Sequence, residues 1–340
     1  MSEKMNRRNF LKKTLAASAT APLILSFEEK ALLAAKSNYS KSPEKKTASM
    51  KIPTGKIKNV EITRLIVGGN LTSGFAHSRD LIYVSSLLRH YFTDDKIFET
   101  WQLCEENGIN TAILRLDNQV VRLINKYWHE VGGNIQWLAQ VKIKEDDLFS
   151  DISRAIDNGA IGAYIHGGVA DKFITQGKID LIAKAVEYIK DNGVIAGVAG
   201  HLLQVPMTCE KEGLDVDFYM KTLNSGNYWT AGPRLIEDEN WVPDPEKEIV
   251  PEYNPRTHDN IWATTPQQTI AFMKKVKKPW IAYKVLGAGA IHPKEGFDYA
   301  FRNGADFICV GMFDFQVQED VAIAQKVLSS DLKRKRPWCA

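Results

Sequence analysis

The sequence predicts a (β/α)8 barrel of the α/β class, in which eight parallel strands alternate with helices. Apolar, β-rich runs alternate with helical patterns along most of the 340 residues. The repeating unit is clearest at 278–312, where a β-rich run, a glycine-rich turn, a helical pattern, Gly304-Ala305-Asp306 and a second apolar run follow one another. An open doubly wound sheet is the alternative, and it is disfavoured because no GxGxxG motif follows an early strand.

Each element is placed by its pattern and by its start and stop signals. Thr93 or Asp94 caps the first barrel helix, and Gly108, Gly159 and Gly193 end three of the helices. The strands are expected at 62–70, 110–116, 135–142, 162–166, 194–201, 217–223, 278–286 and 307–312, and the helices at 94–107, 118–131, 146–158, 178–192, 265–276, 293–303 and 316–329, with a short irregular helix near 205–211.

The chain divides into a barrel and flanking segments. Residues 1–35 are predicted to be an export signal, 36–56 a disordered linker rich in Lys, Ser and Thr, 57–332 the barrel and 333–340 a tail. The barrel carries a long insertion at 225–263. An insertion of that length is usually functional or disordered, and its many aromatic residues favour order.

The N-terminus has the features of a targeting segment. Arg7 and Arg8 precede an apolar run at 14–27 that is too short to span a membrane comfortably. Adjacent arginines followed by Phe-Leu-Lys resemble a twin-arginine export signal, and a basic amphipathic helix start is the alternative. The resemblance implies a periplasmic or otherwise exported protein that uses the twin-arginine export machinery and folds before export. No cysteine follows the apolar run, so no stable membrane anchor is expected in the mature form.

Composition narrows the class of partner. The net charge is only +3, and much of the positive charge lies at the two ends of the chain, so a nucleic-acid-binding surface is not expected. The four cysteines are far apart and form no CxxC pair, which argues against a zinc ribbon and against a disulfide framework. We expect a small-molecule substrate as the partner.

Active sites of this fold lie at the C-terminal ends of the strands, so polar residues there are the candidates. Lys284 shares a strand face with Ala282, and small neighbours leave room for a long side chain to enter the lumen. Each lysine could instead pair with a carboxylate, and each histidine could bond loop backbone. The predicted catalytic residues are His166, Lys142, Lys221 and Lys284, and the predicted substrate-binding residues are Asn70, Arg115 and His201.

The insertion and three glycines supply further candidates. Tyr228, Trp229 and Trp241 could stack against a sugar or another flat ligand, or could pack the insertion internally. The cofactor-binding candidates, which could instead serve tight strand-to-helix turns, are Gly287, Gly289 and Gly311. NADP or a divalent metal is the cofactor considered, although spacing provides no third metal ligand beside His166 and His201.

Three short runs resemble the aldo-keto reductase family: 65–70 (Leu-Ile-Val-Gly-Gly-Asn), 108–111 (Gly-Ile-Asn-Thr) and 164–166 (Tyr-Ile-His). The resemblance implies a barrel with an Asp and a Tyr after the second strand, a Lys on the third and a His at the end of the fourth. His166 matches that histidine, and Lys142 lies about one residue from the lysine position. The aspartate position holds Ile113, and the tyrosine position falls near Asn118.

These observations predict an exported barrel enzyme that acts on a small polar, sugar-like or carbonyl-bearing molecule by His/Lys acid–base chemistry. A nicotinamide-dependent reductase is the second hypothesis. A solute-binding barrel without catalysis is the third, with the aromatic insertion as its binding surface.

Overall fold

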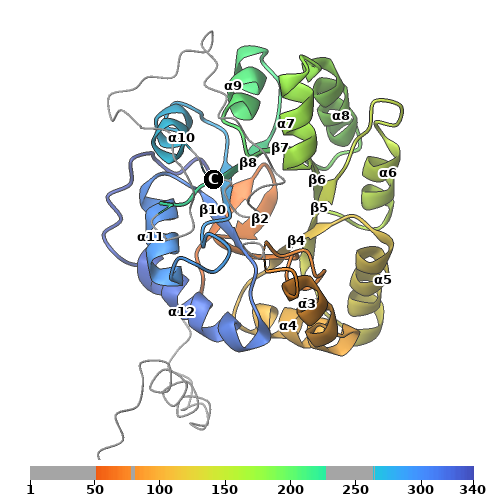
Figure 1. Ribbon diagram of the computed structural model, residues 1–340, viewed down its shortest axis with the longest axis vertical. Helices are drawn as coiled ribbons and strands as arrows, with labels where there is room; N and C mark the ends of the chain where they lie inside the picture. The colour runs from red at the N-terminus through yellow and green to blue at the C-terminus, as the bar shows by residue number, and fades with distance from the viewer. Residues whose placement is uncertain (1–50, 78–80, 227–262, 264) are drawn as a thin grey trace, which may run out of the picture. The chain divides into compact units, whose positions relative to one another are not determined.

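The eight predicted strands form one closed, all-parallel barrel in the order β10-β3-β4-β5-β6-β7-β8-β9 (Figure 1). The computed structural model describes residues 51–77, 81–226, 263 and 265–340. The barrel strands are β3 (Leu65–Gly68), β4 (Thr111–Arg115), β5 (Gln136–Val141), β6 (Gly162–Ile165), β7 (Ile195–Gly200), β8 (Phe218–Thr222), β9 (Trp280–Tyr283) and β10 (Phe307–Val310). The predicted (β/α)8 fold class is therefore confirmed.

Helices surround the barrel on its outside, as Figure 1 shows. They are α3 (Val84–Tyr91), α4 (Asp94–Glu106), α5 (Asn118–Lys126), α6 (Ser150–Asp157), α7 (Gly167–Thr175), α8 (Ile179–Asp191), α9 (Gln204–Lys211), α10 (Pro266–Met273), α11 (Pro293–Arg302) and α12 (Val317–Leu328), with a π-helical turn η1 (Tyr127–Val131) and a 3-10 turn η2 (Asp314–Gln316). Of the described helices, none is long and apolar enough to cross a membrane.

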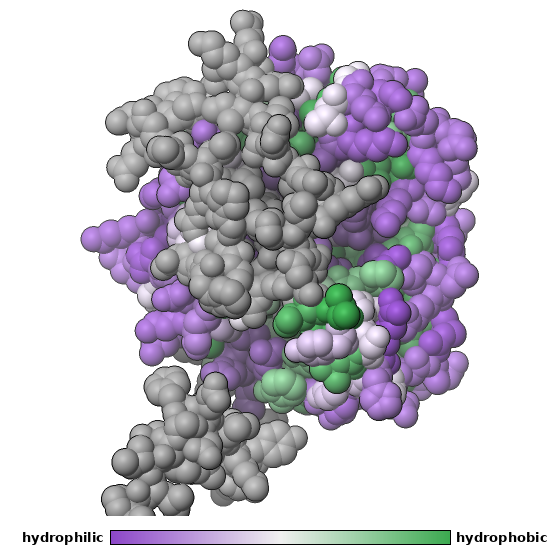
Figure 2. Space-filling model, in the orientation of Figure 1, coloured by the Kyte–Doolittle hydropathy of each residue, from purple (hydrophilic) through white to green (hydrophobic). Residues whose placement is uncertain are grey.

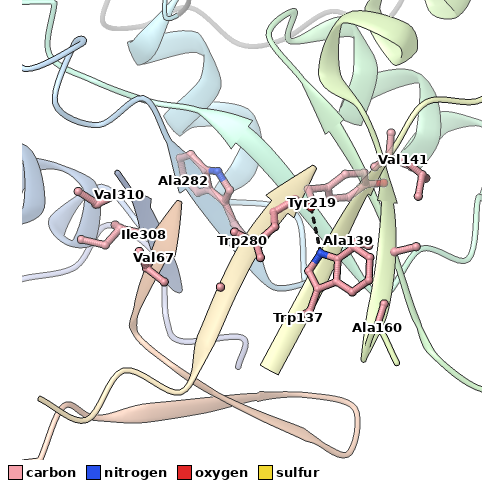
Figure 3. Close-up of a cluster of buried hydrophobic side chains, with 14 of the residues drawn as sticks. Val67, Trp137, Ala139, Val141, Ala160, Tyr219, Trp280, Ala282, Ile308 and Val310 are labelled. Carbon is pink, nitrogen blue, oxygen red and sulfur yellow. Dashed lines mark hydrogen bonds between the residues drawn. The ribbon is translucent and has the colours of Figure 1, made fainter. Parts of the chain in front are cut away.

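Alternation along each strand divides the core into two layers. Ile66, Leu138 and Phe218 belong to the cluster that fills the lumen. Their strand neighbours Trp137 and Tyr219 belong to the larger cluster that packs with the helices (Figure 3). Because almost every strand residue is buried on one side or the other, the strands show the near-continuous apolar runs that made them recognisable.

One hairpin and two helices were not predicted. An antiparallel hairpin, β1 (Thr54–Ile57) and β2 (Val60–Thr63), precedes the barrel and begins inside the segment predicted to be linker. Helix α3 lies in the stretch between the first strand and the first predicted helix, and α7 starts at Gly167-Gly168, a pair that is more typical of a turn. The predicted export signal and the aromatic residues of the insertion lie outside the described residues.

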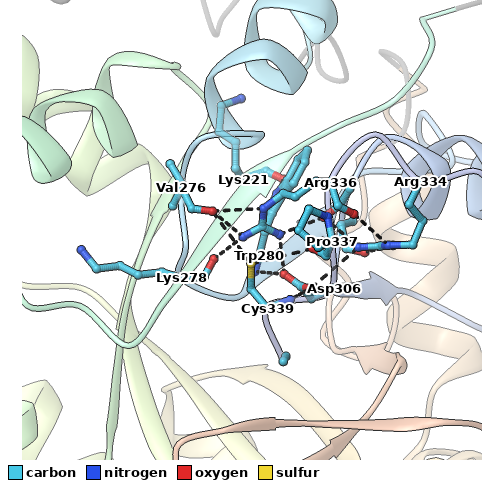
Figure 4. Close-up of polar contacts among 12 residues, drawn as sticks. Lys221, Val276, Lys278, Trp280, Asp306, Arg334, Arg336, Pro337 and Cys339 are labelled. Atoms are coloured by element: carbon cyan, nitrogen blue, oxygen red, sulfur yellow. Dashed lines mark hydrogen bonds and ion pairs between the residues drawn. The ribbon is translucent and has the colours of Figure 1, made fainter.

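The N-terminal end of the barrel is held by the Asp306 cluster, in which Asp306 binds Trp280, Arg336 and Cys339 (Figure 4). The Asp306 carboxylate is fully buried. It accepts hydrogen bonds from the Arg336 guanidinium at 2.6 Å, from the Trp280 amide at 2.9 Å and from the Cys339 amide at 2.8 Å. Buried charges persist when they are paired and hydrogen-bonded in this way.

The segment predicted to be a tail is therefore packed against the barrel. Arg64 and Arg334 contact the ring of Trp338, with guanidinium carbons 3.9 and 3.4 Å from its centroid. Arg64 also donates to the Asp306 carbonyl oxygen at 2.9 Å, so residues separated by most of the barrel sequence meet here. This cluster lies at the starts of β9 and β10. Active sites of this fold lie at the opposite end of the barrel, where the strands end.

Candidate active site at the C-terminal end of the barrel

A cavity of about 470 Å³ opens at the C-terminal ends of the strands. Its floor includes side chains that face the lumen from successive strands, among them Ile113, Tyr164, Ala199 and Met220. Of the predicted site residues, those that line the cavity are Asn70, Arg115, His166, His201, Lys284, Gly289 and Gly311. The described lining includes no Asp or Glu.

His201 is fixed by a carboxylate that the sequence did not single out. Asp171 on α7 lies 2.7 Å from Nδ1 of His201, and the same carboxylate accepts from the backbone amides of His201 and Leu202 at 3.0 Å. An ionised carboxylate only accepts, so the His201 proton is assigned to Nδ1, and Nε2 carries the lone pair of the neutral ring. Burial lowers the pKa of His201, and the charge of Asp171 opposes that shift.

His166 serves as the cap of α7. Its Nδ1 accepts from the Gly168 amide at 3.1 Å, which satisfies one of the amides at the start of the helix and places the imidazole proton on Nε2. Burial lowers the pKa of His166 to about 4, and the positive charge of Lys142 adds to the shift. His166 is consequently a neutral hydrogen-bond donor at pH 7.

Tyr283 and Lys284 reach the cavity from the end of β9 in an unexpected way. Tyr283 faces the lumen together with Ile281, whereas Ala282 packs toward the helices, so the predicted phase of this strand is wrong by one residue. Lys284 nevertheless lines the cavity because its φ of 58° breaks the alternation. A non-glycine residue in the left-handed region is uncommon and is often found at a functional site.

Gly167 marks how closely the tyrosine and the histidine approach. A Cβ atom at this position would lie 2.8 Å from the Tyr283 hydroxyl and 3.0 Å from Cε1 of His201. The two rings are 5.5 Å apart between centroids. Only glycine at this position leaves room for both side chains against the first turn of α7, which explains Gly167.

Two further polar groups complete the wall formed by β4, β5 and β6. Gln140 donates to the Tyr164 hydroxyl at 2.9 Å, and both side chains line the cavity. Arg115 pairs with Asp117 at 2.9 Å, while its guanidinium carbon lies 4.0 Å from the centre of the Phe75 ring. This arrangement holds the guanidinium at the cavity mouth.

The structure does not bring every predicted residue to the cavity. Lys221 is buried but faces the helix layer, opposite to Met220, and its ammonium donates to the His201 carbonyl oxygen and to Thr222 Oγ1, both at 2.8 Å. The expected lumen position of Lys221 is therefore wrong by one residue of strand phase. Lys142 is exposed, and neither it nor Gly287 lines the cavity.

Burial lowers the pKa of Lys221 to about 7. Tyr228, Trp229 and Trp241 lie outside the described residues.

Asp171 and Tyr283 are the residues that sequence reasoning missed. Asp171 interrupts an apolar stretch with Ala170, Phe173 and Ile174, all buried on α7. An acid on an otherwise apolar helical face needs a buried partner, and that requirement was the available signal. Within the described ranges, no group of three or more His, Cys, Asp or Glu residues could hold a metal ion.

Comparisons with known proteins support the fold. The sequence matches no protein-family model and no curated protein. A solved structure from Pseudomonas aeruginosa, assigned as an aldo-keto reductase, is similar over 84% of this chain and 100% of its own, with 12% identity and a TM-score of 0.57. A second structure with the same assignment and source covers 82% and 94%, with 13% identity and a TM-score of 0.55. At these identities the likeness establishes the TIM-barrel fold alone, as the family resemblance implied.

Proposed function

We propose that the protein is an enzyme that moves a proton at the carbon beside the carbonyl group of a small polar or anionic molecule. The observation that carries this proposal is the Asp171–His201 pair, whose histidine lines the same cavity as Tyr283 and Lys284. A carboxylate that fixes the tautomer of a histidine prepares the ring to accept a proton at Nε2. Sugar-like and oxo-acid molecules both contain the required carbonyl group.

Each group has a role in that reaction. His201 Nε2 removes the proton, the C–H electron pair forms the double bond of an enolate, and the carbonyl π pair moves onto oxygen. The Lys284 ammonium and the Tyr283 hydroxyl stabilise the negative oxygen, which is where fixed donors contribute most to catalysis. Arg115 binds a carboxylate of the substrate, and His166 donates from Nε2. Return of the proton to the opposite face of the same carbon completes an epimerisation without an oxidant. Where that carbon carries a hydroxyl group, return of the proton to the former carbonyl carbon, with the hydroxyl proton passing to the former carbonyl oxygen, completes an isomerisation.

Solvent exchange tests the proposal directly. The full chain is incubated in D₂O with a panel of small 2-oxo acids and ketoses, and loss of the α-proton signal is followed by NMR. Exchange with at least one compound, reduced by His201→Gln, is the expected result. Binding without exchange of any compound would overturn the proposal and identify a solute-binding barrel.

A reductase is the second candidate, because the four side-chain types of the aldo-keto reductase site occur together here, from other positions in the barrel. Tyr283, Lys284 and His201 line the cavity, and Asp171 lies behind His201 as its hydrogen-bond partner. Gly289 and Gly311 would then lie beside the cofactor, in the loops after β9 and β10. Titration of the full chain with NADPH, followed by nicotinamide fluorescence, tests this candidate. Tight binding, with oxidation of NADPH only when a carbonyl compound is present, would favour the reductase over the isomerase.

We also propose that the protein is exported by the twin-arginine machinery and acts outside the cytoplasm. The support is the Arg7-Arg8 pair followed by the short apolar run. Replacing both arginines with lysine should leave the precursor in the cytoplasm. Unchanged export of the Arg7→Lys, Arg8→Lys double variant would contradict export by the twin-arginine machinery.

A further inference from the structure

The cavity has two chemically unlike walls. The side formed by β4 to β7, together with the end of β9, carries most of the polar groups described above. The opposite side is mainly apolar and comes from the loop after β3, from α3 and from the loop after β10. Its apolar members include Leu71, Leu81, Val84, Leu88 and Phe313, and the same loops also contribute the polar Asn70, His77 and Gln316 to the lining.

Helix α3 presents a defined face to the cavity. Leu81, Val84 and Leu88 are spaced by three and four residues, so they lie on one side of the helical path, and the Val84 amide bonds the Leu81 carbonyl at 3.1 Å to extend that path. Leu88 is 2% exposed. Ile82 and Leu87 do not line the cavity, and they are 94% and 57% exposed, compared with 43% for Leu81 at the cavity mouth.

The outward side chains make α3 apolar on both sides, and Figure 2 shows hydrophobic surface over this helix. Only the inward three residues line the cavity. A substrate composed solely of hydroxyl and carboxylate groups would lose hydrogen bonds to water against such a wall without replacing them. An apolar group placed there would instead release poorly bonded water.

We propose that the substrate is amphiphilic, with its carbonyl or carboxylate head among Lys284, His201 and Arg115 and an alkyl or aryl tail along α3. The tail contacts Leu81, Val84 and Leu88. The identity of the head rests on the proposed function, whereas the tail rests on the apolar wall alone. The inference narrows the substrate from a small polar molecule to an oxo acid or related carbonyl compound with an apolar side chain.

The test uses straight-chain 2-oxocarboxylates of three to eight carbons, with binding to the full chain measured by calorimetry. Each added methylene should tighten binding about fourfold until the wall is covered, as burial of one CH₂ predicts. Leu81→Ser and Val84→Ser should flatten this dependence on chain length. Ile82→Ser and Leu87→Ser change the same helix on its outer side, so they should keep the dependence and control for effects on folding.

A flat series in the unmodified protein, or no binding at any length, would overturn the inference. So would a series that stays steep in the Leu81→Ser, Val84→Ser double variant, or one that flattens equally in the outer variants. Binding is measured without turnover, which separates the two proposals. Binding that tightens with chain length, but without deuterium exchange, would support the apolar tail and contradict the proton-transfer function. Exchange combined with binding that does not depend on chain length would support the proton-transfer function and contradict the apolar tail.

Discussion

Asp171 lies 2.7 Å from Nδ1 of His201 and thereby joins the helix after β6 to the loop after β7. The two side chains are 10% and 12% exposed, so little solvent competes for the bond. The same carboxylate also accepts the amides of His201 and Leu202, which fixes the loop as well as the ring. The pair is thus positioned before any substrate arrives.

Replacing Asp171 with Asn should lower the proposed exchange rate by about two to four orders of magnitude, because the amide no longer selects the Nδ1–H tautomer. The base must be neutral, so the rate should fall as the pH falls through the pKa of His201. The negative charge of Asp171 raises that pKa, and its loss should therefore move the acid limb to lower pH. Rate–pH profiles of both proteins provide the measurement. An unchanged rate would exclude a role for the pair.

The lysines can be separated by matched substitutions. Lys284→Met keeps the stem and removes the ammonium from the cavity, so exchange should fall about a hundredfold or more. Lys142→Met removes an exposed charge that does not line the cavity and should change the rate less than threefold. Comparable losses in the two variants would indicate a general effect of charge rather than contact with substrate.

His166 predicts a pH dependence of stability. Its pKa is about 4 in the folded state and about 6.5 when unfolded, so the unfolded chain binds the proton more strongly between these values. The contribution of His166 to the free energy of unfolding is fully present above pH 6.5 and is lost as the pH falls toward 4. The full change is up to about 3 kcal/mol, reduced by partial exposure of the ring.

His166→Asn tests this dependence because asparagine can still cap α7 while it does not titrate. Its free energy of unfolding, measured by urea denaturation, should fall less between pH 6.5 and 4 than that of the unmodified protein. The exposed His129 supplies the control, and His129→Asn should leave the pH dependence as it was. The same dependence of unfolding free energy on pH in all three proteins would contradict the assignment of His166 as the titrating group.

The Asp306 cluster should matter for stability and not for chemistry. Arg336→Leu leaves a buried carboxylate without its main counter-charge and should cost about 3–5 kcal/mol. Arg302→Leu removes a half-exposed ion pair with Asp298 and should cost less than about 1 kcal/mol. Because the cluster lies at the end of the barrel opposite the cavity, substrate binding by folded Arg336→Leu protein should be unchanged. Equal losses of stability in the two variants would show that the cluster contributes little.

Sequence patterns predicted the barrel well because buried parallel strands and the helices between them differ in length and composition. They predicted the site less well because a lumen position depends on strand phase to a single residue. Lys221 falls on the wrong face for this reason, and Lys284 reaches the cavity only through a left-handed backbone conformation that no periodicity encodes. Asp171 was missed because its helix begins with two glycines, a pair more typical of a turn, and the first of them is required by the tertiary approach of Tyr283 and His201.

The Asp306 cluster also has a consequence for the order of events during folding. Arg64 bonds the backbone at Asp306, which is 242 residues further along the chain, and Arg336 completes the cluster. Contacts of such long range form late and slow the folding of a domain. A nascent chain stopped before residue 336 lacks the guanidinium that pairs with Asp306, so we expect it to be more vulnerable to proteolysis than the full chain.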